Sequence, residues 1–320
     1  MKKIQNILLY VVNYNKNKFK NKLLLSLPDF NSILLVDIGA AGEIDPRWKS
    51  IDKNLKYIGF EPDERSNLLL INKYHCLKEY IVHPYAISNI NSTDIEINIC
   101  KKEMVSSVLS PNLQFLNRFP DKNRFDIIKK IKVKSKKIDD FNFINPDFIK
   151  LDIQGGELDA LKSAEDSLGD VFGLEIEVEF TKIYVNQPLF GEISNYCQEK
   201  NFEFIDFVSL CRWERDSINS YGQCVFGDAL FLKMPEYVLS KEISDERLSS
   251  YLGILMLYKR FDLIDKVYEI ISPARQKSYS LFFEKLKKLK KSHNKIRIIN
   301  NIVSKITRIM ESECKTHLFY

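Results

Sequence analysis

Short apolar runs alternate with stretches of helical periodicity between about residues 31 and 233. Such alternation is typical of a mainly parallel sheet with helices on both faces. Seven strands are predicted in this way: Ile33–Ile38, Lys56–Glu61, Tyr80–Ile87, Phe148–Ile153, Val171–Phe180, Phe202–Leu210 and Gln223–Lys233. No helical pattern separates the last two, so they are predicted to pair as a terminal β-hairpin.

The segments between and around these strands define the expected organisation. Helices are predicted after Pro62, from Gly155 to about Leu168 and from Phe190 to Lys200. Residues 93–99 alternate polar and apolar and predict an added hairpin strand, whereas residues 100–145 look irregular. We therefore expect an N-terminal helical segment at 1–30, an α/β domain at 31–234 and a separate basic helical segment at 235–320.

The charge of the chain is uneven. Residues 281–320 hold ten Lys or Arg against three Glu, a net of +7, so the rest sums to −2 of the total +5. A near-neutral body argues against a basic nucleic-acid groove. In the tail, Lys285–Lys291 and Ile296–Met310 predict either a solvated helical face or contact with an acidic membrane surface or an anionic glycan carrier.

Cysteine usage and hydropathy favour a cytoplasmic protein. The six cysteines are scattered, with no C-x-x-C pair, as expected of reduced thiols. The apolar stretch Ile7–Val12 is short and lacks a small-residue cleavage site, and no run of eighteen apolar residues occurs. No pair of the four histidines has metal-ligand spacing, so no metal ligands are predicted. A Mg²⁺ ion at Asp152 stays an alternative, since hard cations bind oxygen ligands.

The first strand ends with an acidic residue, Asp37, and continues into a turn of small residues at 39–42. Gly39 permits backbone torsions that a Cβ would forbid, and small side chains let a ligand approach the main chain. Asp37 would repel a pyrophosphate but attract a cofactor that carries an ammonium and a sulfonium. The alternative is a tight strand–helix turn with a surface Asp.

The second strand ends in Glu61, nineteen residues after Gly42. A carboxylate at this position can accept hydrogen bonds from both ribose hydroxyls of a nucleoside. Glu61 could instead favour the N-terminus of the next helix. Because NAD also carries this ribose, Glu61 does not discriminate between cofactors.

Acidic residues also follow the central strands. Asp152 and Gln154 share one face of the fourth strand, and Glu157 begins the next helix. Burial of an acidic side chain in a strand costs several kcal/mol of stability unless the side chain is paired or contacts water, so Asp152 is a candidate site residue. On the fifth strand, Glu177 and Glu179 share a face with Glu175 and could supply a general base; a salt-bridged strand face is the alternative.

Taken together, these motifs resemble the FkbM-type methyltransferases. The resemblance rests on Val36-Asp37-Ile38-Gly39, Gly59-Phe60-Glu61-Pro62, Ala86-Ile87-Ser88-Asn89, Ser106-Ser107-Val108-Leu109 and Lys150-Leu151-Asp152-Ile153-Gln154-Gly155-Gly156-Glu157. Glu177-Val178-Glu179-Phe180, Tyr184 and Gln187-Pro188-Leu189-Phe190 resemble a variant found among bacterial polysaccharide-modification genes. Two departures are Ala41-Gly42-Glu43 in place of an Asn-containing turn, and Gln154 where Glu is commoner.

The resemblance implies a Rossmann-like class I methyltransferase fold over about residues 31–233, with S-adenosylmethionine as methyl donor. It implies O-methylation, commonly of a sugar or polyketide hydroxyl, and hence a bacterial surface glycan or its precursor as substrate. The expected cofactor residues are Asp37, Gly39, Ala41, Glu61, Pro62, Ala86, Ile87, Ser107 and Asp152. Asp152, Glu177, Glu179 and Tyr184 are the expected catalytic or acceptor residues, with His83 as the next candidate base.

Two other functions stay open from the sequence. A nicotinamide-dependent oxidoreductase is disfavoured by Asp37, by the terminal hairpin and by Ala41-Gly42-Glu43, which lacks the third glycine of G-x-G-x-x-G. A non-catalytic binding protein could keep the same fold and use its helical tail to recruit partners.

Overall fold

The computed structural model describes residues 23–63, 66, 76–141, 146–215 and 221–290. They fall into two compact units, divided between Phe30 and Asn31 and between Ile270 and Ile271. Residues 235–270 therefore belong to the unit that contains the sheets, whereas the sequence predicted a boundary at 235. The helices predicted before residue 23, at 296–310 and over most of the stretch after Pro62 lie outside the described residues.

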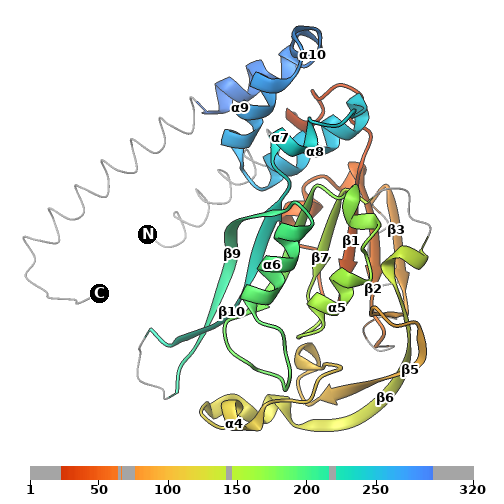
Figure 1. Cartoon of the computed structure of the whole chain (residues 1–320), viewed down its shortest axis with the longest axis vertical. Helices are drawn as coiled ribbons and strands as arrows, with labels where there is room; N and C mark the ends of the chain where they lie inside the picture. Colours follow the sequence, from red (N-terminus) through yellow and green to blue (C-terminus); the bar gives the residue numbers. More distant parts are fainter. Residues whose placement is uncertain (1–22, 64–65, 67–75, 142–145, 216–220, 291–320) are drawn as a thin grey trace, which may run out of the picture. The chain divides into compact units, whose positions relative to one another are not determined.

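In the described part of residues 31–270, the main sheet has seven strands in the order β3-β2-β1-β7-β8-β10-β9 (Figure 1). Their bounds are β1 Ile33–Ile38, β2 Leu55–Phe60, β3 Glu79–His83, β7 Phe148–Leu151, β8 Gly173–Glu179, β9 Glu203–Trp213 and β10 Gln223–Leu232. The first five named are parallel, and β10 runs antiparallel to both β8 and β9. This order confirms the mainly parallel sheet with a terminal hairpin.

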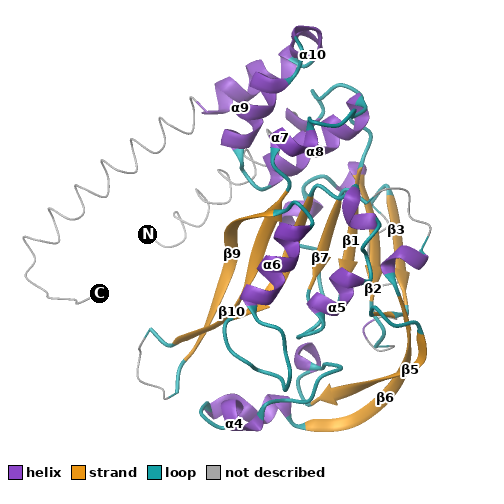
Figure 2. Cartoon of the chain, viewed as in Figure 1, coloured by secondary structure: helices purple, strands orange, loops and turns teal. Residues whose placement is uncertain are grey.

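The central strands are buried because helices cover the sheet. Leu174, Ile176 and Val178 of β8 belong to the same core cluster as Ile193 and Cys197 of α6 (Phe190–Glu199). Figure 2 shows α6 and α5 (Glu157–Lys162) side by side against one face of the sheet.

Helix α5 ends at Lys162, well before the predicted Leu168. The backbone N–H groups of Asp166 and Ser167 donate to the carboxylate of Asp139 instead of continuing the helix. A side chain far away in sequence thus stops α5, which no local pattern indicates.

A second, three-stranded sheet lies beyond the carboxyl ends of β1, β2 and β7 (Figure 1). Its order is β4-β6-β5, with β4 Ala86–Ile87, β5 Ser92–Cys100 and β6 Ile127–Lys136. The strand predicted at 80–87 is split between the two sheets at Pro84, which lacks the N–H that a ladder needs. The region predicted as irregular contains β6 and the short helix α4 (Leu113–Leu116).

Three helices follow the main sheet: α7 Pro235–Val238, α8 Asp245–Leu257 and α9 Phe261–Ile270. Ten of the thirteen residues of α8 are buried. Ser250 Oγ donates to the carbonyl of Ser32 at 3.1 Å, and the Tyr251 hydroxyl donates to that of Lys233 at 2.7 Å. Helix α8 therefore covers the end of the sheet opposite to the carboxyl ends of the parallel strands.

A chain that ends at Met234 is expected to lose its fold, whereas one that ends at Ile270 should keep it. Removing α8 uncovers the apolar residues around it and removes Leu248, Tyr251 and Leu252 from the core. Each such side chain contributes about 1.5–3 kcal/mol, against a net stability of about 5–15 kcal/mol. Thermal unfolding monitored by circular dichroism tests this, and an unchanged melting temperature at Met234 would refute it.

The smaller unit contributes residues 23–30 and 271–290 to the described structure. It contains α10 (Pro273–Ser278), and its buried side chains include Leu23, Leu24, Tyr279 and Phe282. Among all the described residues, no helix is both long and apolar enough to cross a bilayer.

Candidate functional site

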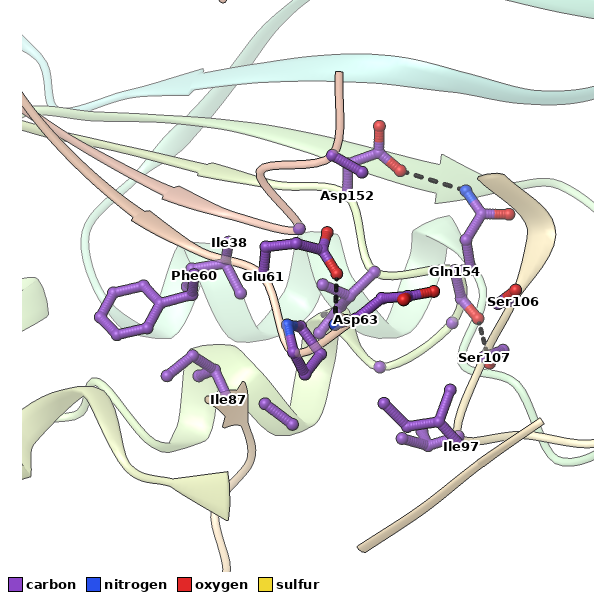
Figure 3. Close-up of a pocket in the computed structure, with 18 of the residues that line it drawn as sticks. Ile38, Phe60, Glu61, Asp63, Ile87, Ile97, Ser106, Ser107, Asp152 and Gln154 are labelled. Carbon is purple, nitrogen blue, oxygen red and sulfur yellow. Dashed lines mark hydrogen bonds between the residues drawn. The ribbon is translucent and has the colours of Figure 1, made fainter. Parts of the chain in front are cut away.

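A cavity of about 590 Å³, here called the main cavity, opens at the carboxyl ends of β1, β2 and β7 (Figure 3). Ile38 and Phe60 line it from the main sheet, and Ile95, Ile97 and Ile99 line it from β5 of the second sheet. Apolar walls with a few polar groups, in a volume of about 300–1,000 Å³, are typical of small-molecule sites. The main cavity therefore lies between the two sheets.

The turn after β1 approaches the main cavity with its backbone. The N–H groups of Gly39 and Ala40 both donate to the carbonyl of Phe60 at 3.0 Å, which ties the end of β1 to the end of β2. Gly39 has φ +85°, and a Cβ built there would lie 1.9 Å from the carbonyl oxygen of Asp152. Only glycine fits this position. Ala41 also lines the cavity.

Glu61 and Pro62 line the cavity at the end of β2. The Glu61 side chain is buried, and its Oε1 accepts a hydrogen bond from the backbone N–H of Asp63 at 2.7 Å (Figure 3). Burial raises the pKa of Glu61 to about 7; the hydrogen bond from Asp63 lowers it, whereas the carboxylates of Asp63 and Glu103 raise it further.

The other expected cofactor residues occupy the cavity wall, with one exception. Ala86, Ile87, Ser107 and Asp152 all line it. Asp37 does not: it is buried, its carboxylate accepts from the Tyr57 hydroxyl at 2.8 Å, and Lys150 Nζ lies 3.8 Å away. The structure thus gives Asp37 two protein partners, whereas the sequence predicted contact with a cofactor cation.

Asp152 presents a carboxylate that is held on both sides. Its Oδ2 lies 3.6 Å from Lys150 Nζ, and its Oδ1 accepts from Gln154 Nε2 at 3.1 Å (Figure 3). Burial opposes the charge on Lys150, but the carboxylates of Asp37 and Asp152 outweigh it, so its pKa lies above the usual range. The side chain of Asp152 keeps 35% of its surface exposed, so it can contact a ligand.

Gln154 connects the main cavity to the residues behind it. Its backbone has φ +59°, which is uncommon without glycine, and Ser107 Oγ donates to its carbonyl at 2.7 Å. Its Nε2 also donates to Glu177, and its Oε1 lies 3.0 Å from the Tyr184 hydroxyl.

Three of the four expected catalytic residues lie outside the cavity wall. Glu177, Glu179 and Tyr184 are buried and do not line the main cavity. Burial raises the pKa of Glu177 well above its usual range, and Asp152 and Glu179 raise it further. Burial likewise raises the pKa of Glu179, with a contribution from Glu157. Of the four, the structure brings only Asp152 into the cavity.

Two other acids from the same motifs have structural partners. Glu157 accepts hydrogen bonds from the N–H groups of Ile153 and Gly155, so it holds the turn after β7. Glu175 is ion-paired with Arg47 at 2.6 Å, so the salt-bridge alternative applies to it. Within the described residues, no group of three or more His, Cys, Asp or Glu is placed to hold a metal ion.

The sequence did not identify the wall formed by β5. The alternation at residues 93–99 predicted the strand, and its isoleucines were a signal for a buried face. Nothing local indicates that this face would cover the ends of strands in another sheet. Lys150 was also missed, because its role depends on the neighbouring strand, where it is paired in register with Asp37.

The sequence match that decides the family covers this cavity. The profile of the methyltransferase FkbM domain matches residues 37–204, more than half of the chain. The chain belongs to the FkbM methyltransferase family. It shows no significant similarity to any curated protein. An FkbM methyltransferase transfers a methyl group from S-adenosylmethionine, so the oxidoreductase alternative is set aside.

Similar solved structures include other methyltransferases. An FkbM methyltransferase from Methylobacillus flagellatus is 19% identical, with a TM-score of 0.35 over 63% of this chain and 44% of that one, less than half of its length. The magnesium protoporphyrin IX methyltransferase of Synechocystis, solved with bound S-adenosylmethionine, is 7% identical, with a TM-score of 0.33 over 69% and 81%. An rRNA methylase from Streptococcus thermophilus is 11% identical, with a TM-score of 0.30 over 69% and 95%.

The main cavity of this FkbM methyltransferase fits its cofactor. In this cavity the carboxylate of Glu61 would accept hydrogen bonds from the ribose hydroxyls, and the isoleucines of β5 would contact the base. Gly39 and Ala41, which also line the cavity, would leave room beside the backbone for the methionine portion.

Glu61→Ala is expected to weaken binding of S-adenosylhomocysteine by about 1.5–3 kcal/mol, because hydrogen bonds to a charged group are lost. The affinity of the unaltered protein should also fall between pH 8 and pH 6. Below a pKa of about 7 the free protein holds a proton on Glu61, which ribose binding must displace. Calorimetry across this pH range measures both effects.

Glu61→Gln is the matched control for the pH dependence, since its amide does not titrate. If the unaltered protein and Glu61→Gln gave the same pH profile, Glu61 would not be the group that binds the ribose.

Proposed function

We propose that this methyltransferase methylates a hydroxyl of a sugar in a bacterial surface glycan or its precursor. The observation that carries the proposal is the carboxylate of Asp152, which lines the main cavity at the centre of the sheet. Ligands of open α/β sheets bind beyond the carboxyl ends of the central strands. The sugar as acceptor is supported by the resemblance of residues 177–190 to the variant found among polysaccharide-modification genes.

The residues around Asp152 suit it to accept the proton of an alcohol. Gln154 Nε2 and Lys150 Nζ each hold one of its oxygens, so the carboxylate has a fixed orientation toward the cavity. A positioned base of this kind contributes about 10²–10⁴-fold to a rate. S-adenosylmethionine supplies an electrophilic methyl group, and the protein contributes alignment of the hydroxyl with it.

Glu177 and Tyr184 act in this proposal through Gln154. Both contact its amide, and neither lines the main cavity. They therefore fix the position of the amide that orients Asp152. A cytoplasmic location, the lack of a nucleic-acid partner and contact of the basic tail with a membrane or a glycan carrier stay predictions.

The test is methyl transfer from labelled S-adenosylmethionine to nucleotide sugars and extracted surface glycan, with bulk tRNA and rRNA as competing acceptors. We expect label in a methyl ether of a sugar, identified by mass spectrometry after hydrolysis, and little label when Asp152 is replaced by Asn. Label confined to RNA or to an amine would refute the proposal.

A further inference from the structure

We propose that a second, open pocket beside the main cavity binds an anionic group of the methyl acceptor, a phosphate or a carboxylate. This inference rests on the proposed function and names the class of its substrate: a negatively charged sugar. The pocket, here called the side pocket, has a volume of about 360 Å³. Its lining residues are Asn112, Gln114, Phe115, Arg118, Phe180, Thr181, Lys182 and Leu189.

The side pocket and the main cavity share one segment of chain. Pro188 lines the main cavity, and the next residue, Leu189, lines the side pocket. The side pocket also begins directly after β8, with Phe180. The two spaces therefore have a wall segment in common, and the proposal places the acceptor's hydroxyl near Asp152 and its anionic group in the side pocket.

The two walls of the side pocket are tied together. Asn112 donates from its backbone N–H to the carbonyl of Ile183 at 2.8 Å, and from its Nδ2 to the carbonyl of Lys182 at 2.9 Å. Its Oδ1 accepts from the backbone N–H of Phe115. These bonds fix the segment that carries Arg118 against the segment that carries Lys182, so the pocket is formed before a ligand binds.

The charge of the lining points to the ligand. Arg118 and Lys182 are the charged residues of the side pocket, and no acidic side chain lines it in the described structure. Both are exposed, and neither forms an ion pair with another described residue, whereas Arg47, Arg247 and Arg260 each face a carboxylate. The Arg118 guanidinium instead lies 5.5 Å from the centre of the Phe115 ring.

Two cations without acidic partners at one pocket favour an anion. A guanidinium binds carboxylate and phosphate through paired N–H groups, and an ammonium adds a point charge. The anion could be the phosphate of a nucleotide sugar or of a pyrophosphate-linked carrier, or the carboxylate of a uronic acid. All three present the same chemistry to Arg118 and Lys182.

The experiment is calorimetric titration of the full chain, loaded with S-adenosylhomocysteine, with inorganic pyrophosphate, uridine diphosphate and galacturonate. The double variant Arg118→Gln/Lys182→Gln is expected to weaken the probe that binds best by tenfold or more, and to leave S-adenosylhomocysteine affinity unchanged. The preferred probe identifies the source of the anion. The control Lys132→Gln/Lys134→Gln makes the same charge change at exposed positions of β6.

Equal weakening in both double variants would show that binding depends on overall charge, which would overturn the inference. Absence of binding of all three probes at millimolar concentration would overturn it too. Because the titration needs no turnover, it is independent of the proposed reaction. Anion binding that depends on Arg118 and Lys182 without any sugar methylation would leave the side pocket in place and refute the proposed function.

Discussion

Gly39→Val is expected to abolish binding of S-adenosylhomocysteine. The smallest side chain at this position already places a Cβ 1.9 Å from the Asp152 carbonyl oxygen and 2.9 Å from Ile153 Cγ2. The φ of +85° adds backbone strain for any residue other than glycine. To relieve the collision and the strain, the turn must move away from the end of β7, and it then no longer forms this part of the cavity wall. Calorimetry should detect no binding at a hundred times the Kd of the unaltered protein.

A matched control lies three residues further along the chain. Gly42 also has a positive φ, +105°, but a Cβ there meets nothing within 4 Å. Gly42→Ala therefore carries backbone strain without the collision, and although Gly42 also lines the cavity, this variant should lose less affinity than Gly39→Val does. Circular dichroism establishes whether each variant is folded. A folded Gly39→Val protein that still becomes saturated with ligand would refute the placement of the turn beside the cofactor.

Asp152→Asn is expected to lower turnover a hundredfold or more, on the scale of general-base catalysis. Its affinity for S-adenosylhomocysteine should stay close to that of the unaltered protein, because Glu61 and the Gly39 turn remain intact. Asparagine keeps the shape of the side chain but cannot accept the proton of the acceptor hydroxyl. The measurement is the rate of labelled methyl transfer at saturating donor.

The variants Glu177→Gln and Glu179→Gln distinguish the role of Asp152, which lines the cavity, from the roles of the two acids that do not. Since neither side chain lines the cavity, we expect each to affect turnover less than Asp152→Asn does. Full turnover in all three variants would place the base elsewhere. His83 is then a poor substitute: it does not line the cavity, and its ring lies 5.3 Å from that of Phe60.

The sequence predicts the site residues at the ends of β1 and β2 better than it predicts the positions of the acids on β8. Ile33–Ile38 is a strand with the predicted bounds, and Gly39 and Glu61 lie in the cavity as the strand–turn pattern indicates. The acids of β8 show the limit of such patterns. Period two places Glu177 and Glu179 on one face, but it cannot reveal that both are buried outside the cavity wall or that Gln154, from another segment, hydrogen-bonds to Glu177.

The two larger differences also have physical causes. Strand β6 was missed because lysine is depleted in strands, yet here lysines alternate with Ile131 and Val133 and leave their charges in water. The boundary expected at 235 follows from the basic charge of the tail, but the helices directly after it are not basic. Helix α8 has no charged residue from Leu248 to Leu257 and is buried over that whole stretch, so it belongs to the core of the larger unit.

Because the main cavity lies between two sheets, a cofactor bound there would become part of the protein's packing. The two sides of the cavity are linked next to β5, where Ser107 pairs with Asn98 and donates to the carbonyl of Gln154. Ile97 and Ile99 are buried, yet together with Ile95 they also line the cavity. A cofactor that fills this space would add to the apolar contacts of these side chains. The methyl donor would thus pack as part of the hydrophobic core, and each turnover would replace S-adenosylhomocysteine with a new S-adenosylmethionine in that position.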